Sequence, residues 1–161
     1  DSVCEHRDNL DQNHAREAPL LVKLSPDLDE TALENSIRVI KEFSIQGVIV
    51  ANTTVKRPEL KSKHRFENGG LSGKPLQKRS TEMIRNVFQK LGTEMPIIGV
   101  GGIFSGADAY DKIRAGASAV QIYTALIYEG PGQVRKVKRE LAKLLNEDGF
   151  TSVSDAVGVD S

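Results

Sequence analysis

The sequence predicts an α/β fold in which a parallel sheet is covered by helices on both faces. Short, continuously apolar runs alternate along the chain with longer segments whose apolar residues recur at helical spacing. A parallel strand buried on both faces reads as an unbroken apolar run, whereas a strand with one wet face alternates apolar and polar residues. At 161 residues, the chain has the length of about one domain.

The apolar runs are predicted as four strands. The first contains Lys23 and is bounded by Pro19 and Pro26, which favour a short strand over a helix. The second ends at a polar loop, residues 52–73, and the third ends in a glycine-rich turn. The strands are expected at residues 20–24, 47–51, 96–100 and 119–123.

The helices between these runs carry recognisable end signals. Asp29 and Ser105 can act as N-caps, Pro75 suits a first helical turn, and Gly116 can end a helix. Helices are expected at residues 3–16, 30–43, 75–91, 105–115 and 132–147, with a short closing turn at 152–158. The last helix is amphipathic, with a predicted buried stripe of Val134, Val137, Leu141, Leu144 and Leu145.

Composition excludes several classes of protein. The chain has 22 basic and 22 acidic side chains, so it is not polycationic, and nucleic acid is not expected as its main partner. Its longest apolar runs fall far short of the ~20 residues that cross a bilayer. Cys4 cannot form an internal disulfide, and the histidines have no metal-ligand spacing with it.

The position of the glycine-rich turn separates two architectures. About four parallel strands fit either a small doubly wound sheet or half of an eight-stranded barrel. A doubly wound dinucleotide domain places its phosphate loop after the first strand, whereas a barrel often binds phosphate after its last two strands. In this chain the turn at residues 99–102 comes late, which favours the barrel.

Two turns form a candidate phosphate site. Gly101 and Gly102 follow the third strand, where glycine lets backbone N–H groups approach a phosphate and the next helix N-terminus adds a favourable dipole. A tight turn that needs positive φ explains this motif equally well. Tyr123 and Thr124 follow the next strand and can supply further N–H groups at the start of a short helix. Together, the two strand ends favour phosphate binding.

Polar residues at the ends of the first two strands are candidate ligand contacts. Lys23 stands in an apolar run and needs a partner, either an acidic group inside a barrel or negative charge on a cofactor ring or substrate. Asn52 can donate and accept hydrogen bonds, and Thr53 adds a hydroxyl, which suits recognition of a planar ring. Both residues could instead close the strand in an Asx or Thr turn.

The segment at residues 69–76, with the sequence GGLSGKPL, ends the long loop and enters a helix. Three glycines in five positions indicate either backbone held close to another group or the hinge of a lid. The two explanations are compatible, because a lid over a barrel mouth closes on the ligand.

Taken together, these motifs closely resemble the dihydroorotate dehydrogenase family. The resemblance runs in order and with consistent spacing from about Ala18 to Gly158, and the form GGLSGKPL is similar to the quinone-linked, membrane-associated class. The segments that carry it are residues 21–23, 52–54, 69–76, 97–102 and 121–124.

The resemblance implies a TIM (β/α)8 barrel that uses FMN to oxidise dihydroorotate to orotate in pyrimidine biosynthesis, with ubiquinone as electron acceptor. By motif, Asn52 and Thr53 would bind the substrate and Lys23 would contact the flavin ring. Ala51 departs from the threonine of some members, a change of little consequence if the backbone makes the contact. The resemblance assigns to FMN and its phosphate Lys23, Ala51, Ser72, Gly73, Gly101, Gly102, Tyr123 and Thr124.

The resemblance also implies that residues 1–161 are the C-terminal part of one barrel, because a typical barrel needs ~250 residues. The catalytic serine base, the first strands and the membrane-associated helices are expected in a missing N-terminal half. The chain alone is therefore expected to be inactive. The mitochondrial inner membrane is the implied location, with a bacterial inner membrane as the alternative.

Two other functions stay open from the residues alone. A barrel isomerase or lyase would use the same turns for a phosphorylated substrate. A noncatalytic phosphate-ligand binding module would use the glycine loops only as turns.

Overall fold

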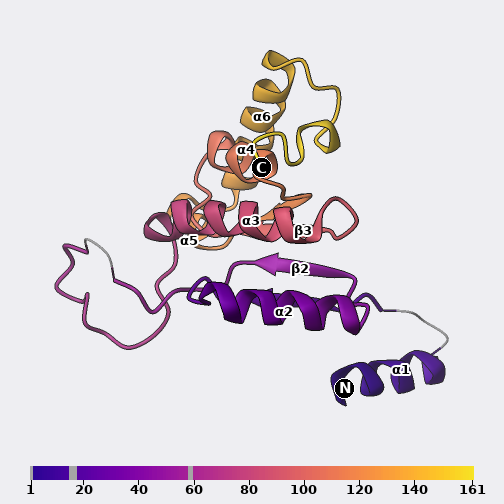
Figure 1. Cartoon of the computed structure of the whole chain (residues 1–161). Coiled ribbons are helices and arrows are strands. Elements are labelled where there is room, and N and C mark those ends of the chain that lie inside the picture. The colour runs from indigo at the N-terminus through magenta and orange to yellow at the C-terminus, as the bar shows by residue number, and fades with distance from the viewer. Residues whose placement is uncertain (1, 15–17, 58–59) are drawn as a thin grey trace.

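The structure is a computed structural model that describes residues 2–14, 18–57 and 60–161. Its centre is a four-stranded parallel sheet with the spatial order β1-β2-β3-β4 (Figure 1). Strands that follow one another in both sequence and space are typical of a barrel, whereas a doubly wound sheet reverses its order at a switch point. The predicted α/β class with a parallel sheet is confirmed. The strands are β1 (Leu21–Leu24), β2 (Gly47–Val50), β3 (Ile97–Val100) and β4 (Ala119–Gln121).

The helices begin and end close to the predicted positions. Asp29 Oδ1 accepts from Ala32 N, and Ser105 Oγ accepts from Asp108 N, so both predicted N-caps are confirmed. Pro75 does not lie in the first turn of the helix as predicted, because it belongs to a short 3₁₀ turn at Lys74–Leu76 that precedes the helix. The helices are α1 (Ser2–His14), α2 (Glu30–Glu42), α3 (Gln77–Leu91), α4 (Gly106–Arg114), α5 (Thr124–Glu129) and α6 (Gly132–Glu147), with a 3₁₀ turn at Ser154–Ala156. Of the predicted first helix, residues 15 and 16 lie outside the described residues.

One continuous core joins the strands to helices α2, α3 and α4. Val48 and Ile97 from the sheet are fully buried against Ile84 and Val87 of α3. The burial of such side chains supplies most of the free energy that holds the layers together. One predicted core residue is wrong: Val134 of α6 is 45% exposed, because it lies in the first turn of the helix, and the apolar clusters take up this face of α6 only from Val137 onward.

Helices α4 and α6 pack unusually closely through Gly106. A β-carbon at Gly106 would lie only 2.6 Å from Leu141 N and 2.7 Å from the carbonyl carbon of Glu140. Glu140 Oε2 also accepts a hydrogen bond of 2.7 Å from Gly106 N. The absence of a side chain at this position therefore lets the two helices approach each other.

Apolar surface remains uncovered beside β1. Side chains from α1, β1 and α2, including Val3, Leu21 and Val39, line an open groove of about 600 Å³. In the described part of the chain, β1 and β4 each pair with a strand on one side only. Such open edges are sites for association with further strands. Among the described helices, none is long and apolar enough to cross a membrane.

The close packing at Gly106 leads to a testable result. Gly106→Ala should lower the free energy of unfolding by about 1–3 kcal/mol, because the added methyl meets backbone atoms that cannot move aside freely. Gly132 is the matched control, since it also begins a helix and a β-carbon there has nothing within 4 Å. Gly132→Ala should leave stability unchanged or raise it slightly. Equal urea-unfolding midpoints for the two variants would contradict this account of the α4–α6 contact.

Candidate functional site

A cavity of about 290 Å³ opens at the carboxyl ends of the four strands. Parallel strands end at the same edge of a sheet, so the turns that follow them meet there. The structure brings together at this cavity every residue that the resemblance assigned to cofactor or substrate. These residues are Lys23, Ala51, Asn52, Thr53, Ser72, Gly73, Gly101, Gly102, Tyr123 and Thr124.

The turn after β3 requires glycine and also leaves backbone donors available. Gly101 and Gly102 have φ values of 119° and 72°, which L side chains rarely adopt. A β-carbon on Gly102 would also lie 2.5 Å from Gln77 Cβ and 2.9 Å from Gln77 N, so the turn packs directly on the start of α3. The explanation as a tight turn therefore holds, and it does not compete with a binding role.

Backbone amides at the two turns are unpaired. Among the described residues, the N–H groups of Gly101, Gly102, Tyr123 and Thr124 donate no hydrogen bond to another group of the chain. All of these residues line the same cavity. Unpaired backbone donors that share one cavity are the arrangement that binds a phosphate or another anion.

The N-terminus of α4 does not add to this anion site as the sequence suggested. The Asp108 amide donates to Ser105 Oγ over 3.2 Å, and the Gly106 amide donates to the Glu140 carboxylate. The Glu140 carboxylate therefore already occupies the position where an anion would meet the helix dipole. The backbone donors left unpaired here, among the described residues, are the amides of the glycine turn and of residues 123–124.

The glycine-rich segment at residues 69–73 lies against both strand ends. Thr124 Oγ1 donates a hydrogen bond of 2.9 Å to Ser72 Oγ, and a β-carbon on Gly73 would lie 3.2 Å from Thr124 Cγ2. Gly70 packs on the side chain of Thr53 so closely that a β-carbon there would overlap its hydroxyl. The glycines therefore mark close backbone approach, the first of the two explanations offered by the sequence.

Asn52 and Thr53 follow β2 directly, and both are exposed and line the cavity. Asn52 Oδ1 accepts a hydrogen bond of 2.9 Å from the amide of the next residue, Thr53, whereas the Asx turn offered as the alternative explanation would take the amide of Thr54, which donates to Leu71 O instead. The Asn52 side-chain NH₂ has no partner among the described residues, and neither has the Thr53 hydroxyl as a donor. The end of β2 thus brings an NH₂ group and a hydroxyl to the lining of the cavity.

Lys23 differs from the sequence-based expectation. A lysine in an apolar run needs a partner when it is buried, yet the side chain of Lys23 is exposed and forms no ion pair within the described residues. The reason is its place on β1, the edge strand of the described sheet, which has a neighbouring strand, β2, on one side only. Lys23 lines the cavity and brings a positive charge that has no acidic partner among the described residues.

Ala51 contributes to the cavity through its backbone. Its side chain is buried in the core, and its N–H donates a hydrogen bond of 3.1 Å to Val100 O. The peptide bond that precedes it is cis. A side chain larger than alanine would point into the core, so a ligand at this position would meet backbone atoms.

A buried lysine, which sequence reasoning missed, supports the glycine turn. Lys112 Nζ donates hydrogen bonds to Ser80 Oγ at 2.9 Å and to Thr81 Oγ1 at 3.0 Å. Ser80 Oγ in turn donates to Val100 O at 2.6 Å, immediately before Gly101. Burial lowers the pKa of Lys112 to about 8. This network fixes α3 and α4 to the end of β3.

Two further acidic residues hold loops around the cavity. Asp108 accepts from Phe104 N at 2.8 Å and from the Gln77 side chain at 2.5 Å, which ties the turn after β3 to α3. Asp27 accepts from Thr54 Oγ1 at 2.6 Å and from the Val55 amide at 2.8 Å. Burial raises the pKa of Asp27, but these hydrogen bonds and nearby Arg79 outweigh burial and leave its pKa below the ordinary value.

A cavity at the carboxyl edge of a sheet in barrel order, with unpaired amides after β3 and β4, is the arrangement typical of α/β barrels that bind phosphate. The chain belongs to the dihydroorotate dehydrogenase family, because the family model with the description "Dihydroorotate dehydrogenase" matches residues 3–145. The predicted family is thereby confirmed.

Individual relatives agree with this assignment. The chain is 54% identical over 147 residues to the dihydroorotate dehydrogenase (quinone) of Xanthobacter autotrophicus, covering 91% of this chain and 41% of that protein. It is 49% identical over 144 residues to the same enzyme of Halobacterium salinarum, covering 89% of this chain and 41% of the relative. The chain therefore spans about 41% of the length of these curated relatives.

Solved structures show the same fold. A ligand-free dihydroorotate dehydrogenase (DHODH) from Eimeria tenella superposes with a TM-score of 0.85 at 45% identity, covering 88% of this chain and 40% of that one. The complex of the Eimeria tenella enzyme with ferulenol gives a TM-score of 0.86 at 45% identity, covering 89% and 38% of the two chains. Four strands in barrel order thus match part of a dihydroorotate dehydrogenase.

The lowered pKa of Lys112 predicts a specific pH dependence of stability. Between about pH 8 and the ordinary lysine value of 10.5, the unfolded chain holds a proton that the folded chain has lost, so stability rises with pH. The unfolding free energy of the native protein minus that of Lys112→Met should rise by about 3 kcal/mol across this interval. Urea unfolding at pH 7.5 and 10.5 measures it. If the unfolding free energies of the two proteins changed with pH in parallel, the lowered pKa of Lys112 would be refuted.

Proposed function

We propose that this protein is an FMN-dependent enzyme that oxidises dihydroorotate to orotate in pyrimidine biosynthesis and passes the electrons to a quinone. The observation that carries the proposal is the convergence of the cofactor and substrate positions on one cavity, with unpaired amides at its phosphate end. Residues 1–161 would form the C-terminal part of a single barrel domain and supply the FMN site and part of the substrate site.

The residues at the cavity fit FMN. The amides of Gly101, Gly102, Tyr123 and Thr124 suit its phosphate, because backbone N–H groups bind phosphate oxygens at short range. The neighbouring hydroxyl of Ser72, already bonded to Thr124, is placed to join this end of the site. At the other end, β1 presents the ammonium of Lys23 and β2 leads to the polar side chains of Asn52 and Thr53. When bound, FMN would supply a two-electron acceptor.

Lys23 would stabilise negative charge in this site. A lysine ammonium beside a flavin ring or an anionic substrate favours the more negative state of either, and it acts more strongly once water is excluded. The exposed Lys23 has no competing carboxylate partner among the described residues, so its charge is available for this purpose.

Asn52 and Thr53 would orient the pyrimidine. The Asn52 NH₂ can donate to a ring carbonyl or carboxylate, while its Oδ1 is held by the Thr53 amide. That backbone contact fixes the side chain before the substrate arrives, which reduces the entropy lost on binding. Oxidation to orotate also removes a proton from the substrate, and a serine in the other half of the barrel is the proposed base.

The rest of the barrel is the proposed partner of this chain. The open edges of β1 and β4 and the apolar groove between α1, β1 and α2 would be covered by the remaining strands and helices. The curated relatives are long enough to supply them, since this chain spans about 41% of their length. The chain alone would therefore be inactive. A quinone acceptor places the enzyme at a membrane, proposed as the mitochondrial or a bacterial inner membrane.

The decisive experiment expresses this chain together with the sequence that precedes it in its gene. The purified protein should be yellow, release FMN on denaturation, and reduce a soluble quinone analogue with dihydroorotate. A colourless protein that a sugar phosphate stabilises would instead support an isomerase or lyase. A protein that binds a phosphorylated ligand without turnover, and keeps its ligand affinity when a bulky residue at Gly101 lowers its stability, would support a noncatalytic module.

Replacement of Lys23 tests its proposed role. Lys23→Met keeps most of the side-chain length and removes the charge, so flavin reduction by dihydroorotate should slow by about tenfold or more while the fold persists. Stopped-flow bleaching of the flavin measures the rate, and circular dichroism reports the fold. Lys143→Met on α6 is the control, because Lys143 is exposed and does not line the cavity. Equal reduction rates in both variants would remove Lys23 from the site.

A further inference from the structure

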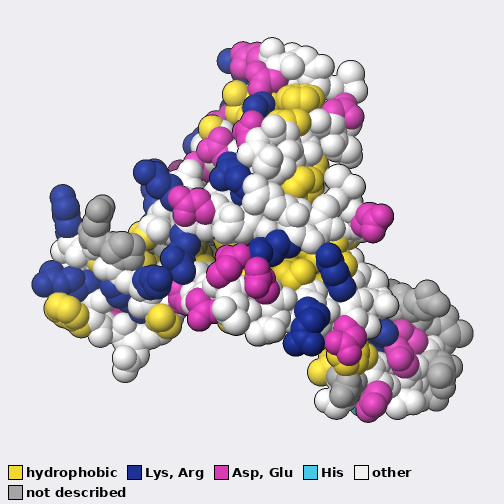
Figure 2. Space-filling model, in the orientation of Figure 1, with side chains coloured by type: hydrophobic (Ala, Val, Ile, Leu, Met, Phe, Trp, Pro, Cys, Tyr) yellow, Lys and Arg dark blue, Asp and Glu magenta, His cyan; other side chains and the backbone are white. Residues whose placement is uncertain are grey.

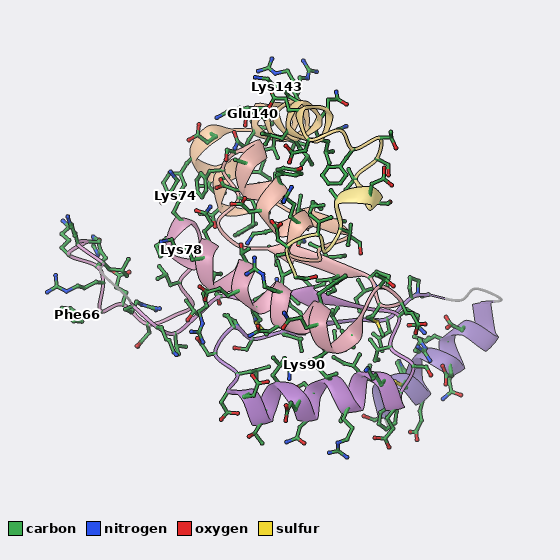
Figure 3. All side chains as sticks on the ribbon, turned by 45° about the horizontal axis from the view of Figure 1, so that its top comes forward. Phe66, Lys74, Lys78, Lys90, Glu140 and Lys143 are labelled. Atoms are coloured by element: carbon green, nitrogen blue, oxygen red, sulfur yellow. The ribbon has the colours of Figure 1, made fainter. Side chains whose placement is uncertain are left out.

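The segment between β2 and the glycine-rich stretch projects from the body of the molecule. Figure 1 shows it as a long excursion on the side away from α1, and Figure 3 places Phe66 near its outer end. We name residues 55–57 and 61–66 the basic loop. Every described residue from 61 to 70 is exposed. This surface has no part in the cavity, which is lined by the residues at the two bases of the loop.

The basic loop carries a surplus of positive charge. It contains Lys56, Arg57, Lys61, Lys63 and Arg65, and Figure 2 shows Lys and Arg side chains gathered on the projection. The nearby carboxylate of Glu67 is engaged by His64 Nδ1 at 2.5 Å. Within the described residues, no acidic side chain forms an ion pair with a lysine or arginine of the loop. The whole chain has no net charge, so this concentration of cations is local.

Two large apolar side chains stand among these cations. Phe66 is 81% exposed and Val55 is 74% exposed, although the core offers apolar residues ample burial elsewhere. The Arg65 guanidinium lies 4.6 Å from the centroid of the Phe66 ring. Exposed apolar residues surrounded by lysine and arginine are typical of surfaces that bind the headgroup region of an anionic membrane.

The base of the loop is fixed to the cavity wall. Arg57 Nη1 donates to Thr54 O at 3.0 Å and its Nη2 donates to Gly69 O, which closes the two sides of the loop together. Below this closure, Thr54 and Leu71 exchange backbone hydrogen bonds of 3.1 and 2.7 Å. The outer end is therefore presented at a defined place relative to Thr53 and Ser72, which line the cavity.

We propose that the basic loop binds anionic phospholipid headgroups, with Phe66 entering the interface between headgroups and acyl chains. The proposal rests on the proposed function, because a lipid-soluble quinone would reach the flavin from a membrane. It adds a lipid contact within this chain to any membrane segments elsewhere in the protein. A single anionic molecule would meet the cations alone, whereas a membrane also buries Phe66 and Val55.

The test uses a tryptophan reporter in the protein that contains this chain and its preceding sequence. Phe66→Trp should show a blue-shifted emission, and quenching by brominated lipids, with vesicles of phosphatidylcholine and phosphatidylglycerol but not with phosphatidylcholine alone. Val134→Trp is the matched control, because Val134 is exposed beside Arg135, Lys136, Lys138 and Arg139 on α6. The control should respond to neither vesicle. The emission of the unsubstituted protein is subtracted in each case.

Charge removal provides the second measurement. Replacing Lys56, Lys61, Lys63 and Arg65 by Gln should raise the lipid concentration for half-maximal binding by about tenfold or more. The same replacement of Arg135, Lys136, Lys138 and Arg139 should leave it unchanged. Unshifted emission of Phe66→Trp, or equal loss of lipid binding in both sets, would overturn the proposal. The proposal would also be overturned if the charge-removed loop variant bound vesicles like the native protein and lost affinity only for an oligonucleotide or for dihydroorotate.

These outcomes separate the inference from the proposed function. Dihydroorotate oxidation with a soluble quinone analogue should be the same in the loop variants and the native protein. A protein that is active in this assay but whose basic loop does not bind lipid would refute only the proposed lipid contact. A protein without FMN or activity would refute the proposed function, whatever its loop binds.

Discussion

The organisation of the site depends on the contact between the glycine turn after β3 and the first residue of α3. Gly102 lies so close to Gln77 that no side chain fits between them, and both glycines adopt positive φ. This contact places the end of β3, the start of α3 and the turn toward β4 in one small volume. The unpaired backbone amides of the glycine turn keep their positions because the chain on either side of them has no room to shift.

Polar groups inside the molecule maintain that contact. Lys112 bridges α4 to α3, Ser80 passes the connection to Val100, and Asp108 holds Phe104 and Gln77 together. A buried lysine costs free energy in proportion to its desolvation, which is why its pKa falls to about 8. The side-chain acceptors of its ammonium, Ser80 Oγ and Thr81 Oγ1, are neutral oxygens, so Lys112 joins α4 to α3 without an ion pair.

Much of the fold and of the site could be predicted from the sequence, for physical reasons that also explain the errors. Unbroken apolar runs revealed the parallel strands, and Asp29 and Ser105 revealed helix starts, because these signals are local. The late glycine turn, read with residues 121–124, identified the cavity because parallel strands share one carboxyl edge. Whether Val134 and Lys23 are buried or exposed depends on which neighbours cover them, and no local pattern specifies that. Lys112 escaped notice in a charged helix, although its spacing from Ala109 placed it on the buried face.

The closure at the base of the long loop separates two parts of the sequence that differ in their freedom to change. Arg57 and the Thr54–Leu71 pair hold the two sides together, so the distance between Thr53 and Ser72 does not depend on how many residues lie outside them. Lengthening a loop beyond such a clamp costs little entropy, since the cost grows only with the logarithm of its length. Insertions, deletions and new surface chemistry can therefore accumulate beyond the clamp during evolution while the geometry of the cavity is inherited unaltered.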